Sequence, residues 1–458
     1  MILITCDTLR ADRLGAYGYP HPTSPNVDAF ARESIVFQEA YAAAPWTGAS
    51  LSSLLSGRMP EEIGVTGGNK FLMPNEVVTI PEILRDAKLA TAAVVSNYVL
   101  KRSPVQGDVG VQQGFAHFDD TMTSKEKNRE TFERIGPDTT KAAIQWLEQQ
   151  KTRGDDRFFF WVHYQDPHGP YLPPPEHAQL FERPLTEEAD VPLGKGHKGK
   201  GRIPLYQRLE NEQRPERYRI QYDGEVHYFD ESFGHLLDWL RANGWYEDTL
   251  IVFSSDHGES LGEHGYWFCH GENLNREVVR VPFIVRFPKG APHVGAQQDG
   301  AYRRFAPVVG HLDLWPTIFA AFGISAPPNR GTSLFQKQLP DNRIMPQSFG
   351  GVDMPVYWRA ISDGRHRVIA APGEPTKLFD IWADPGETTD LAAKRPKVAA
   401  ALAQRYEAFL KSHAQPPVAG IPIDVGALKG LKALGYAGDE DEHDHREHET
   451  PGLDPDSE

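Results

Sequence analysis

Four short runs along the chain are apolar throughout, as expected for β-strands that are buried on both faces. They cover residues 2–5 (ILIT), 91–96 (TAAVVS), 158–164 (FFFWVHY) and 250–255 (LIVFSS). Stretches with helical spacing lie between them, at 138–150 with Asp138 as the expected N-cap and at 223–244, ending on Gly244. This alternation predicts an α/β fold in which helices flank a mainly parallel central sheet.

The pattern changes near residue 346, where short strand-like pieces and one helical stretch follow each other. We therefore expect a catalytic domain over residues 1–345 and a smaller C-terminal α+β subdomain over 346–436. Residues 437–458 are acidic and have almost nothing to bury, which predicts a disordered tail, although its three histidines could hold a metal loosely. The basic, glycine-rich run at 194–202 (GKGHKGKGR) is either a solvated loop or a lid that contacts substrate.

Composition excludes several classes of protein. The chain has 458 residues, of which 40% are hydrophobic and 24% charged, and these proportions are typical of a globular protein. The formal charge of −15 argues against nucleic acid or an anionic membrane as the main partner. Much of the charge is local, because residues 439–458 hold ten acids against Arg446 and leave a net charge of about −6 for the rest.

Cysteine content and the start of the chain bear on the compartment. Cys6 and Cys269 could form at most one disulfide, so no secreted disulfide framework is indicated. No apolar run reaches the length of a membrane span. A predicted strand follows Met1 at once and leaves no room for a signal peptide, so we expect a cytoplasmic protein; a leader missing from this sequence would give the same abrupt start. The oligomeric state stays open.

One hydroxyl stands apart in residues 44–58 (APWTGASLSSLLSGR). Leucines at helical spacing predict a short helix, with Ser50 as a cap at its start and Gly57 just past its end. Thr47 therefore lies close to the helix N-terminus, where unpaired N–H groups and the helix dipole favour an anion. Thr47 is either a further capping residue or a nucleophile that attacks a bound sulfate or phosphate.

Polar side chains follow three of the predicted strands. Asp7 comes after the first strand, His168 after the third, and Asp256 and His257 after the fourth. Taken singly, an aspartate after a strand is usually a turn or capping residue. Carboxylates and imidazoles delivered together to one edge of a sheet are what a divalent metal site requires, so their joint occurrence indicates such a site.

The same segments carry a family resemblance. Residues 7–47 (DTLRADRLGAYGYPHPTSPNVDAFARESIVFQEAYAAAPWT), 166–171 (DPHGPY), 254–265 (SSDHGESLGEHG) and 378–392 (LFDIWADPGETTDLA) resemble the sulfatase family of the alkaline phosphatase superfamily. The similarity runs in order over nearly all of residues 1–436. It implies an alkaline-phosphatase-like sheet and a site at its edge.

The resemblance assigns roles one residue at a time. Asp7 matches a first-strand aspartate that binds the metal, although many relatives have a second aspartate where this chain has Thr8. Asp256 and His257 match a later metal-binding pair, with Thr47 as a fourth ligand. His168 matches a histidine that contacts the transferred group or the leaving oxygen, and His270 matches the position of a Lys or His in relatives.

The chain departs from the family at Thr47. Sulfatases carry Cys or Ser in Cys/Ser-x-Pro-Ser-Arg, which is converted to formylglycine, whereas residues 47–51 read Thr-Gly-Ala-Ser-Leu. Formylglycine is therefore not expected here. Threonine stands at this position in phosphoglycerol and phosphoethanolamine transferases of the superfamily, which this chain resembles less, and a metal-activated hydroxyl is a competent nucleophile.

Three functions follow from this combination. The first is a metal-dependent hydrolase that cleaves a small-molecule or saccharide sulfate or phosphate ester with Thr47 as nucleophile. The second is a phosphodiesterase or phosphoryl transferase that forms a threonyl phosphate, and the third is an inactive family member that only binds an anion. The expected cofactor is one divalent cation, Mn, Zn, Mg or Ca, with Mn or Zn favoured because an imidazole is among the ligands; a second metal stays open.

Overall fold

The fold is built on a nine-stranded sheet in a computed structural model, which describes residues 1–424 except 66–70, 104, 108, 126–131, 351–356, 372 and 413–415. The strand order is β14-β15-β2-β13-β10-β1-β9-β5-β6. The strands are β1 (Ile2–Cys6), β2 (Ile35–Phe37), β5 (Ala90–Val95), β6 (His117–Asp119), β9 (Phe158–Tyr164), β10 (Ile251–Ser255), β13 (Phe283–Arg286), β14 (Gln297–Asp299) and β15 (Tyr302–Phe305). The predicted tail, 437–458, lies outside the described residues.

The centre of the sheet is parallel, as predicted. Strand β1 pairs in parallel with β10 and β9, and β9 continues in parallel to β5 and β6. Strand β13 is antiparallel to both of its neighbours, and β14 is antiparallel to β15. All four predicted strands are present within one residue of the expected bounds.

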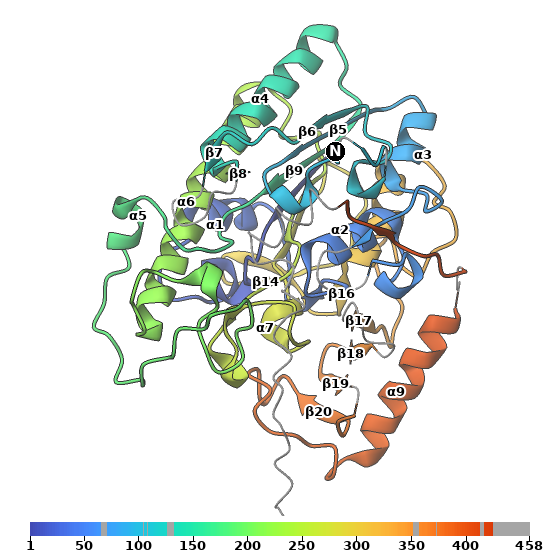
Figure 1. Cartoon of the computed structure of the whole chain (residues 1–458). Helices are drawn as coiled ribbons and strands as arrows, with labels where there is room; N and C mark the ends of the chain where they lie inside the picture. The colour runs from blue at the N-terminus through green and yellow to red at the C-terminus, as the bar shows by residue number, and fades with distance from the viewer. Residues whose placement is uncertain are drawn as a thin grey trace, which may run out of the picture.

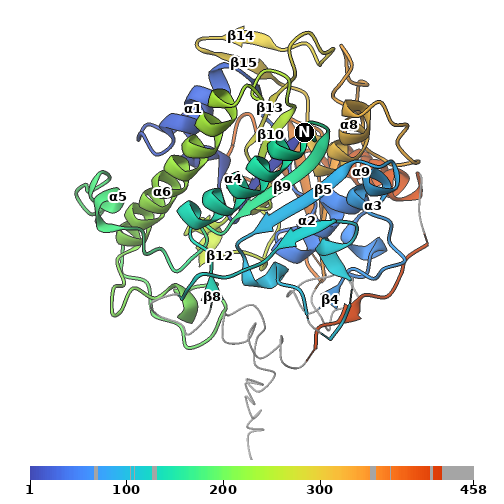
Figure 2. The same ribbon diagram turned by 90° about the horizontal axis from the view of Figure 1, so that it is seen from above.

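Helices cover both faces of this sheet (Figures 1 and 2). Alternate residues of β1 point to opposite faces: Ile2 and Ile4 pack among the buried residues of α1 (Pro25–Arg32), α4 (Gly136–Arg153) and α6 (Pro215–Ala242). Leu3 packs with α2 (Thr47–Ser56), α3 (Ile80–Asp86) and α8 (Leu314–Ala321) on the other face. The sheet is thus buried on both sides, which explains its continuous apolar runs.

The C-terminal part contains a second sheet. Its antiparallel strands are β17 (Met345–Phe349), β18 (Trp358–Ser362), β19 (His366–Ala370) and β20 (Lys377–Asp380), in that order. Helix α9 (Pro396–Lys411) packs on this sheet through Leu402 and Tyr406 (Figure 1). An α+β arrangement is therefore present where it was expected; the division of the chain at residue 345 stays a prediction.

The remaining elements are short. Four pairs of strands are β3 (Ala40–Tyr41) with β16 (Val309–Gly310), β4 (Phe71–Leu72) with β21 (Ile421–Pro422), β7 (Ser124–Lys125) with β8 (Phe132–Glu133), and β11 (Ser260–Leu261) with β12 (Trp267–Cys269). Helices α5 (Pro175–Gln179) and α7 (Arg276–Val279) are brief. No helix of the described chain is long and apolar enough to cross a membrane.

Three predicted helix starts were wrong. Helix α4 begins at Gly136 with Ile135 as N-cap, and Asp138 lies in its first turn. Helix α6 begins at Pro215 rather than 223 and ends at Ala242. In both cases a proline stands in the first turn, where its missing N–H costs nothing. Helix α2 begins at Thr47, so Ser50 is inside the helix and not its cap.

We expect the carboxylate of Asp230 to stabilise the contact between α6 and α1. It accepts hydrogen bonds from the backbone N–H groups of Asn26 (2.9 Å) and Val27 (2.8 Å), at the start of α1. Asp230→Ala leaves these buried donors unpaired and should lower the free energy of unfolding by about 1–3 kcal/mol in urea denaturation. Asp238→Ala on the same helix, whose side chain is 74% exposed, should change it by less than about 0.5 kcal/mol. Equal effects of the two substitutions would contradict the capping role.

Candidate active site at the carboxyl ends of the strands

The parallel register places three chain segments at one edge of the sheet. Cys6, the last residue of β1, is level with Tyr164 of β9 and Ser255 of β10. The ladder continues one step further, because the Asp7 N–H donates to the Tyr164 carbonyl (2.9 Å) and the Asp256 N–H donates to the Cys6 carbonyl (3.1 Å). Two buried carboxylates are therefore held side by side by backbone pairing.

The predicted metal-ligand side chains converge. His257 Nε2 lies 3.9 Å from Asp7 Oδ1, 3.4 Å from Asp256 Oδ2 and 3.3 Å from the hydroxyl oxygen of Thr47. All four residues are fully buried. Donor atoms that share one cation at about 2.0–2.2 Å lie roughly 3 Å or a little more from each other. The separations fit a single divalent ion between these side chains.

Unpaired atoms give an independent test of that fit. Among the described residues, Asp7 Oδ1 and Asp256 Oδ2 are buried with no hydrogen-bond partner. The other oxygen of each carboxylate is engaged: Asn97 donates to Asp7 Oδ2, and the His257 N–H donates to Asp256 Oδ1 (2.7 Å). Buried polar atoms are nearly always paired. One open oxygen on each carboxylate is what a bound cation would satisfy.

The electrostatics of the cluster point the same way. Burial raises the pKa of Asp7 to about 7, against a lowering by His257 and by the Asn97 amide. Burial and the charge of Asp7 also raise the pKa of Asp256. Two carboxylates in one dry site disfavour each other's charge, and a divalent cation removes that cost. His257 is prepared as a ligand, because its Nδ1 lies 2.9 Å from the Gly258 carbonyl and donates to it, leaving Nε2 as the acceptor atom.

Thr47 is the first residue of α2. A hydroxyl inside the helix joins that end of α2 to the segment of Asp256 and His257 by a hydrogen bond. The Ser50 hydroxyl donates to the Asp256 carbonyl at 2.6 Å. Thr47 is thereby held against the cluster, at the positive end of the helix dipole, where an anion is stabilised.

The other two predicted histidines, His168 and His270, lie near His257. The rings of His257 and His270 lie 4.5 Å apart, and those of His270 and His168 lie 5.3 Å apart. His168 Nδ1 is 2.7 Å from the Gly169 carbonyl, which fixes the ring. The rings of Trp46 and His270 lie 5.5 Å apart and nearly perpendicular to each other. All six residues predicted from the sequence therefore form one cluster.

A buried carboxyl next to His270 was not predicted. Glu259 Oε1 lies 3.0 Å from His270 Nδ1, and the Tyr171 hydroxyl donates to Glu259 Oε2 at 3.1 Å. Burial raises the pKa of Glu259 to about 8 and lowers the pKa of His270 to about 4. The two groups thus share one proton at neutral pH rather than carrying two charges. The run Asp-His-Gly-Glu was the available signal, with Glu259 two residues beyond His257.

Two further residues behind Asp7 were missed. The Asn97 amide reaches Asp7 from the end of β5, and His163 Nε2 lies 3.8 Å from Asp7 Oδ2. The Trp161 indole N–H donates to the Thr5 hydroxyl (2.9 Å), which in turn donates to His163 Nδ1 (2.8 Å). In that arrangement the proton of the neutral His163 ring is on Nε2, facing Asp7. Asn97 thus supports the position and charge of the carboxylate, and His163 lies directly behind it.

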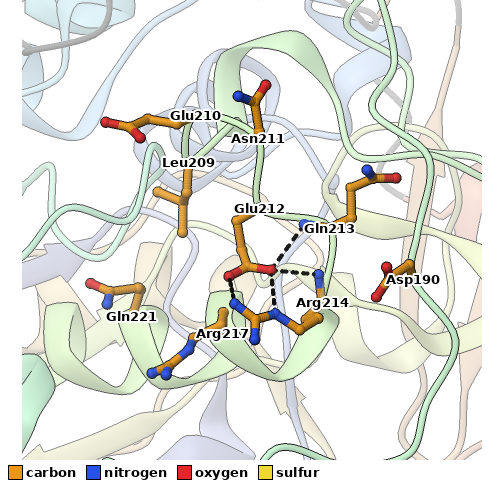
Figure 3. A pocket seen from close by; sticks show the side chains of 9 residues that line it. All are labelled: Asp190, Leu209, Glu210, Asn211, Glu212, Gln213, Arg214, Arg217 and Gln221. Atoms are coloured by element: carbon orange, nitrogen blue, oxygen red, sulfur yellow. Dashed lines mark hydrogen bonds and ion pairs between the residues drawn. The ribbon is translucent and has the colours of Figure 1, made fainter.

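A separate hollow of about 670 Å³ lies at the start of α6 (Figure 3). None of the six predicted site residues lines it; its walls are Asp190, Leu209, Glu210, Asn211, Glu212, Gln213, Arg214, Arg217 and Gln221. Glu212 accepts hydrogen bonds from the Arg214 guanidinium and from the Gln213 N–H (3.0 Å). The charges of Glu212 and Arg214 at the centre of this hollow are thus paired with each other, whereas the carboxylates at the strand ends each have an open oxygen.

Comparison with known proteins decides the family. The Sulfatase family model matches residues 1–324. The chain belongs to the sulfatase family. This sulfatase is 26% identical over 411 residues to choline-sulfatase of Rhizobium meliloti, covering 81% of this chain and 77% of the relative. It is also 26% identical over 409 residues to iduronate 2-sulfatase of Homo sapiens, covering 74% and 72%.

Solved structures confirm the fold. A protein in complex with its substrate D-glucosamine-2-N,6-O-disulfate superimposes with a TM-score of 0.71 at 21% identity, covering 91% of this chain and 99% of that one. Phosphonate monoester hydrolase of Agrobacterium radiobacter gives 0.68 at 18% identity, covering 89% and 94%. The alkaline-phosphatase-like α/β architecture is confirmed. As a sulfatase the chain is an ester-hydrolysing enzyme of a metal-dependent family.

We expect Asp256→Asn to weaken divalent-metal binding at this site by more than about tenfold, because it replaces a carboxylate ligand by a neutral amide of the same shape. The metal-stripped variant should unfold at the same or a higher temperature than the parent, since a buried like charge is gone. Thermal unfolding with and without Mn²⁺ measures both effects, with Asp248→Asn as the exposed control. An undiminished Mn²⁺-dependent gain in Tm would rule out Asp256 as a ligand.

Proposed function

We propose that this sulfatase hydrolyses a sulfate or phosphate ester with the Thr47 hydroxyl as nucleophile and Asp7, Asp256 and His257 as metal ligands. The observation that carries the proposal is the placement of the Thr47 oxygen, buried and 3.3 Å from His257 Nε2, beside two carboxylate oxygens that lack partners among the described residues. The sequence resemblance matches Thr47 to the residue that sulfatases convert to formylglycine, so we infer that it takes that role without conversion.

A divalent cation held by these residues would lower the pKa of the Thr47 hydroxyl and neutralise charge on the bound ester. The start of α2 adds a fixed positive potential for the anionic group. Thr47 would then lose its proton to solvent and attack sulfur or phosphorus in line with the leaving oxygen. The bond from the central atom to that oxygen breaks, the alcohol leaves with a proton from an imidazole, and a threonyl ester remains on the protein. Water hydrolyses this ester in a second step and restores the hydroxyl.

The two histidines are suited to the leaving oxygen. His168 and His270 lie with their rings 5.3 Å apart on the same side of the cluster. Burial holds His270 neutral in the protein alone, but an anionic ester beside it raises its pKa and favours the protonated form that donates. The proton that Glu259 shares with His270 Nδ1 keeps that ring in one orientation.

The identity of the nucleophile favours a phosphate ester or diester as strongly as a sulfate ester. Formylglycine hydrate expels sulfate with its second hydroxyl, and threonine has none. A threonyl sulfate must therefore be opened by water at sulfur, whereas a threonyl phosphate is opened by in-line attack at phosphorus. The fold shared with phosphonate monoester hydrolase is compatible with this second reaction. One relative is named for choline sulfate, and one similar structure holds a sulfated glucosamine. Choline and saccharide esters are therefore the first leaving groups to test.

Thr47→Ala should lower kcat/KM by at least about 10³-fold, because the attacking atom is removed. Thr47→Ser keeps the hydroxyl and should retain measurable turnover. The assay uses Mn²⁺-loaded protein with nitrophenyl sulfate, nitrophenyl phosphate and bis(nitrophenyl) phosphate, and mass spectrometry of acid-quenched protein locates any added sulfate or phosphate on Thr47. Unchanged turnover in Thr47→Ala would overturn the nucleophile. Metal binding without Thr47-dependent turnover of any ester would favour the anion-binding alternative.

His168→Ala and His270→Ala should lose more activity on esters with poor leaving groups than on those with good ones. A residue that protonates the leaving oxygen matters most when that oxygen is basic, with an effect of about 10²–10⁴-fold. The measurement is the slope of log(kcat/KM) against the phenol pKa for a series of aryl esters. A steeper negative slope in a variant supports proton donation, and a parallel line at lower rate would show that the histidine only binds the anion.

A further inference from the structure

Two histidines and a glutamate lie together on α5 and α6, outside the catalytic cluster. His227 and Glu231 are one helical turn apart on α6, so both side chains leave the same face. His177 faces them from α5: its Nδ1 lies 2.8 Å from His227 Nδ1, and its Nε2 lies 3.8 Å from Glu231 Oε2. One ligand atom from each residue falls within 4.8 Å of the others.

Close packing fixes the two helices relative to each other. Gly224 lies one turn before His227. A Cβ at this position would lie 2.8 Å from the Pro173 ring and 3.0 Å from the backbone of Ala178, so the close approach of the two segments requires glycine. The Leu172 N–H also donates to Glu225 Oε1 at 2.7 Å. The donor atoms therefore belong to elements whose spacing is set by backbone contact, as a metal site requires.

We infer that His177, His227 and Glu231 form a second divalent-cation site, of the zinc class, that joins α5 to α6. Two imidazole nitrogens and one carboxylate are a common zinc donor set, with water in the fourth position. His177 is buried, whereas the Glu231 side chain is 53% exposed, which gives the ion and its water a path from solvent.

The contact between the His177 and His227 imidazoles is compatible with metal binding. Only one of two Nδ1 atoms 2.8 Å apart can carry the proton between them, so the other already presents a lone pair. Burial and the neighbouring His177 lower the pKa of His227, which favours the neutral, metal-binding form. Two nitrogens on one zinc ion lie about 3.3 Å apart, so binding replaces the hydrogen bond and separates the rings by roughly half an ångström.

A third cluster does not offer the same chemistry. His264, Glu277 and Glu387 also lie close together. Both oxygens of Glu387 are already used, since Arg367 donates to Oε1 (2.5 Å) and the Arg276 N–H donates to Oε2 (2.8 Å). A cation there would have to displace a buried ion pair. The α5–α6 cluster has no such competitor among the described residues.

Zinc at this position would act on the active site only through structure. Residues 169–174 lead directly from His168 into α5, so joining α5 to α6 stabilises the segment that carries His168. The site is independent of the proposed reaction, and its test does not require turnover.

The test compares zinc stoichiometry in full-length, metal-stripped variants by isothermal titration, with the Asp256→Asn substitution present throughout to weaken the catalytic site. In that background His227→Gln should bind one zinc equivalent less and should lose the zinc-dependent rise in Tm. Glu231→Gln, at an exposed position, should weaken the same binding event by about tenfold or more without changing the metal-free Tm. His235→Gln, exposed two turns further along α6, is the matched control and should bind like the parent.

Equal stoichiometry and equal zinc-dependent stabilisation in His227→Gln and His235→Gln would overturn the site. Zinc held only by histidines beyond residue 424 would give that result, because neither substitution touches them. A Co²⁺ titration followed by visible absorption provides a second readout: loss of a four-coordinate spectrum in His227→Gln alone supports the site, and an unchanged spectrum refutes it.

Discussion

The structure depends on two like charges held together at the end of a parallel sheet. Backbone pairing of β1 with β10 places Asp7 and Asp256 side by side, and both are fully buried. Each ionised carboxylate in such a place costs several kcal/mol unless it is paired. Asn97, Thr8 and His257 donate to only one oxygen of each. This cost is concentrated at one point of the fold, where a bound divalent cation would offset it. With the proposed ligands, affinity for the metal and instability without it would then have the same origin.

Helix α2 follows from the same constraint. Its apolar residues, Leu51, Leu54 and Leu55, pack on the sheet and fix the helix axis. Ser50 then reaches the Asp256 carbonyl, and this bond sets the height of the first turn relative to the carboxylates. Thr47 is placed by that turn. The proposed nucleophile is thus positioned by the core on one side and by the Asp256–His257 segment on the other. A hydroxyl with poor intrinsic reactivity needs such fixed placement to attack.

Sequence patterns located the sheet centre and the site because both depend on local signals. Buried parallel strands are apolar throughout, and a polar residue directly after one falls at the common edge; Asp7, Asp256 and His168 were found in this way. Asn97 also directly follows the predicted strand 91–96, but its amide donates to a ligand instead of being one, so a search for metal ligands does not select it. His163 lies inside an apolar strand, where the pattern indicates a buried core residue and not a site residue. Its role depends on the register with β1, which pairs it with Thr5, and no local pattern records that register.

The helix starts show the opposite failure. Apolar spacing placed the start of α6 at 223, whereas the helix begins at Pro215, because Tyr218 and Tyr222 bury their rings between charged neighbours. Spacing alone reads such a stretch as polar, and the proline in the first turn was the better signal. Glu259 was lost for a related reason. Its burial beside His270 and Tyr171 arises from three separate segments that meet only in the folded chain.

The choice between sulfur and phosphorus rests on the second half of the reaction rather than the first. Attack by Thr47 needs the same groups for either ester: a positive potential, an in-line path and a donor for the leaving oxygen. In the proposed reaction the two esters differ at the threonyl ester, because water must then reach the central atom opposite the Thr47 oxygen. The Thr47 hydroxyl is fully buried, and the Trp46 and His270 rings lie 5.5 Å apart. A phosphoryl group tolerates in-line attack by water assisted by an adjacent imidazole, and a sulfuryl group offers less negative charge for His168 and His270 to hold in place. With Thr47 as the proposed nucleophile, a phosphate ester is therefore as strong a candidate substrate as a sulfate ester, although the chain belongs to the sulfatase family.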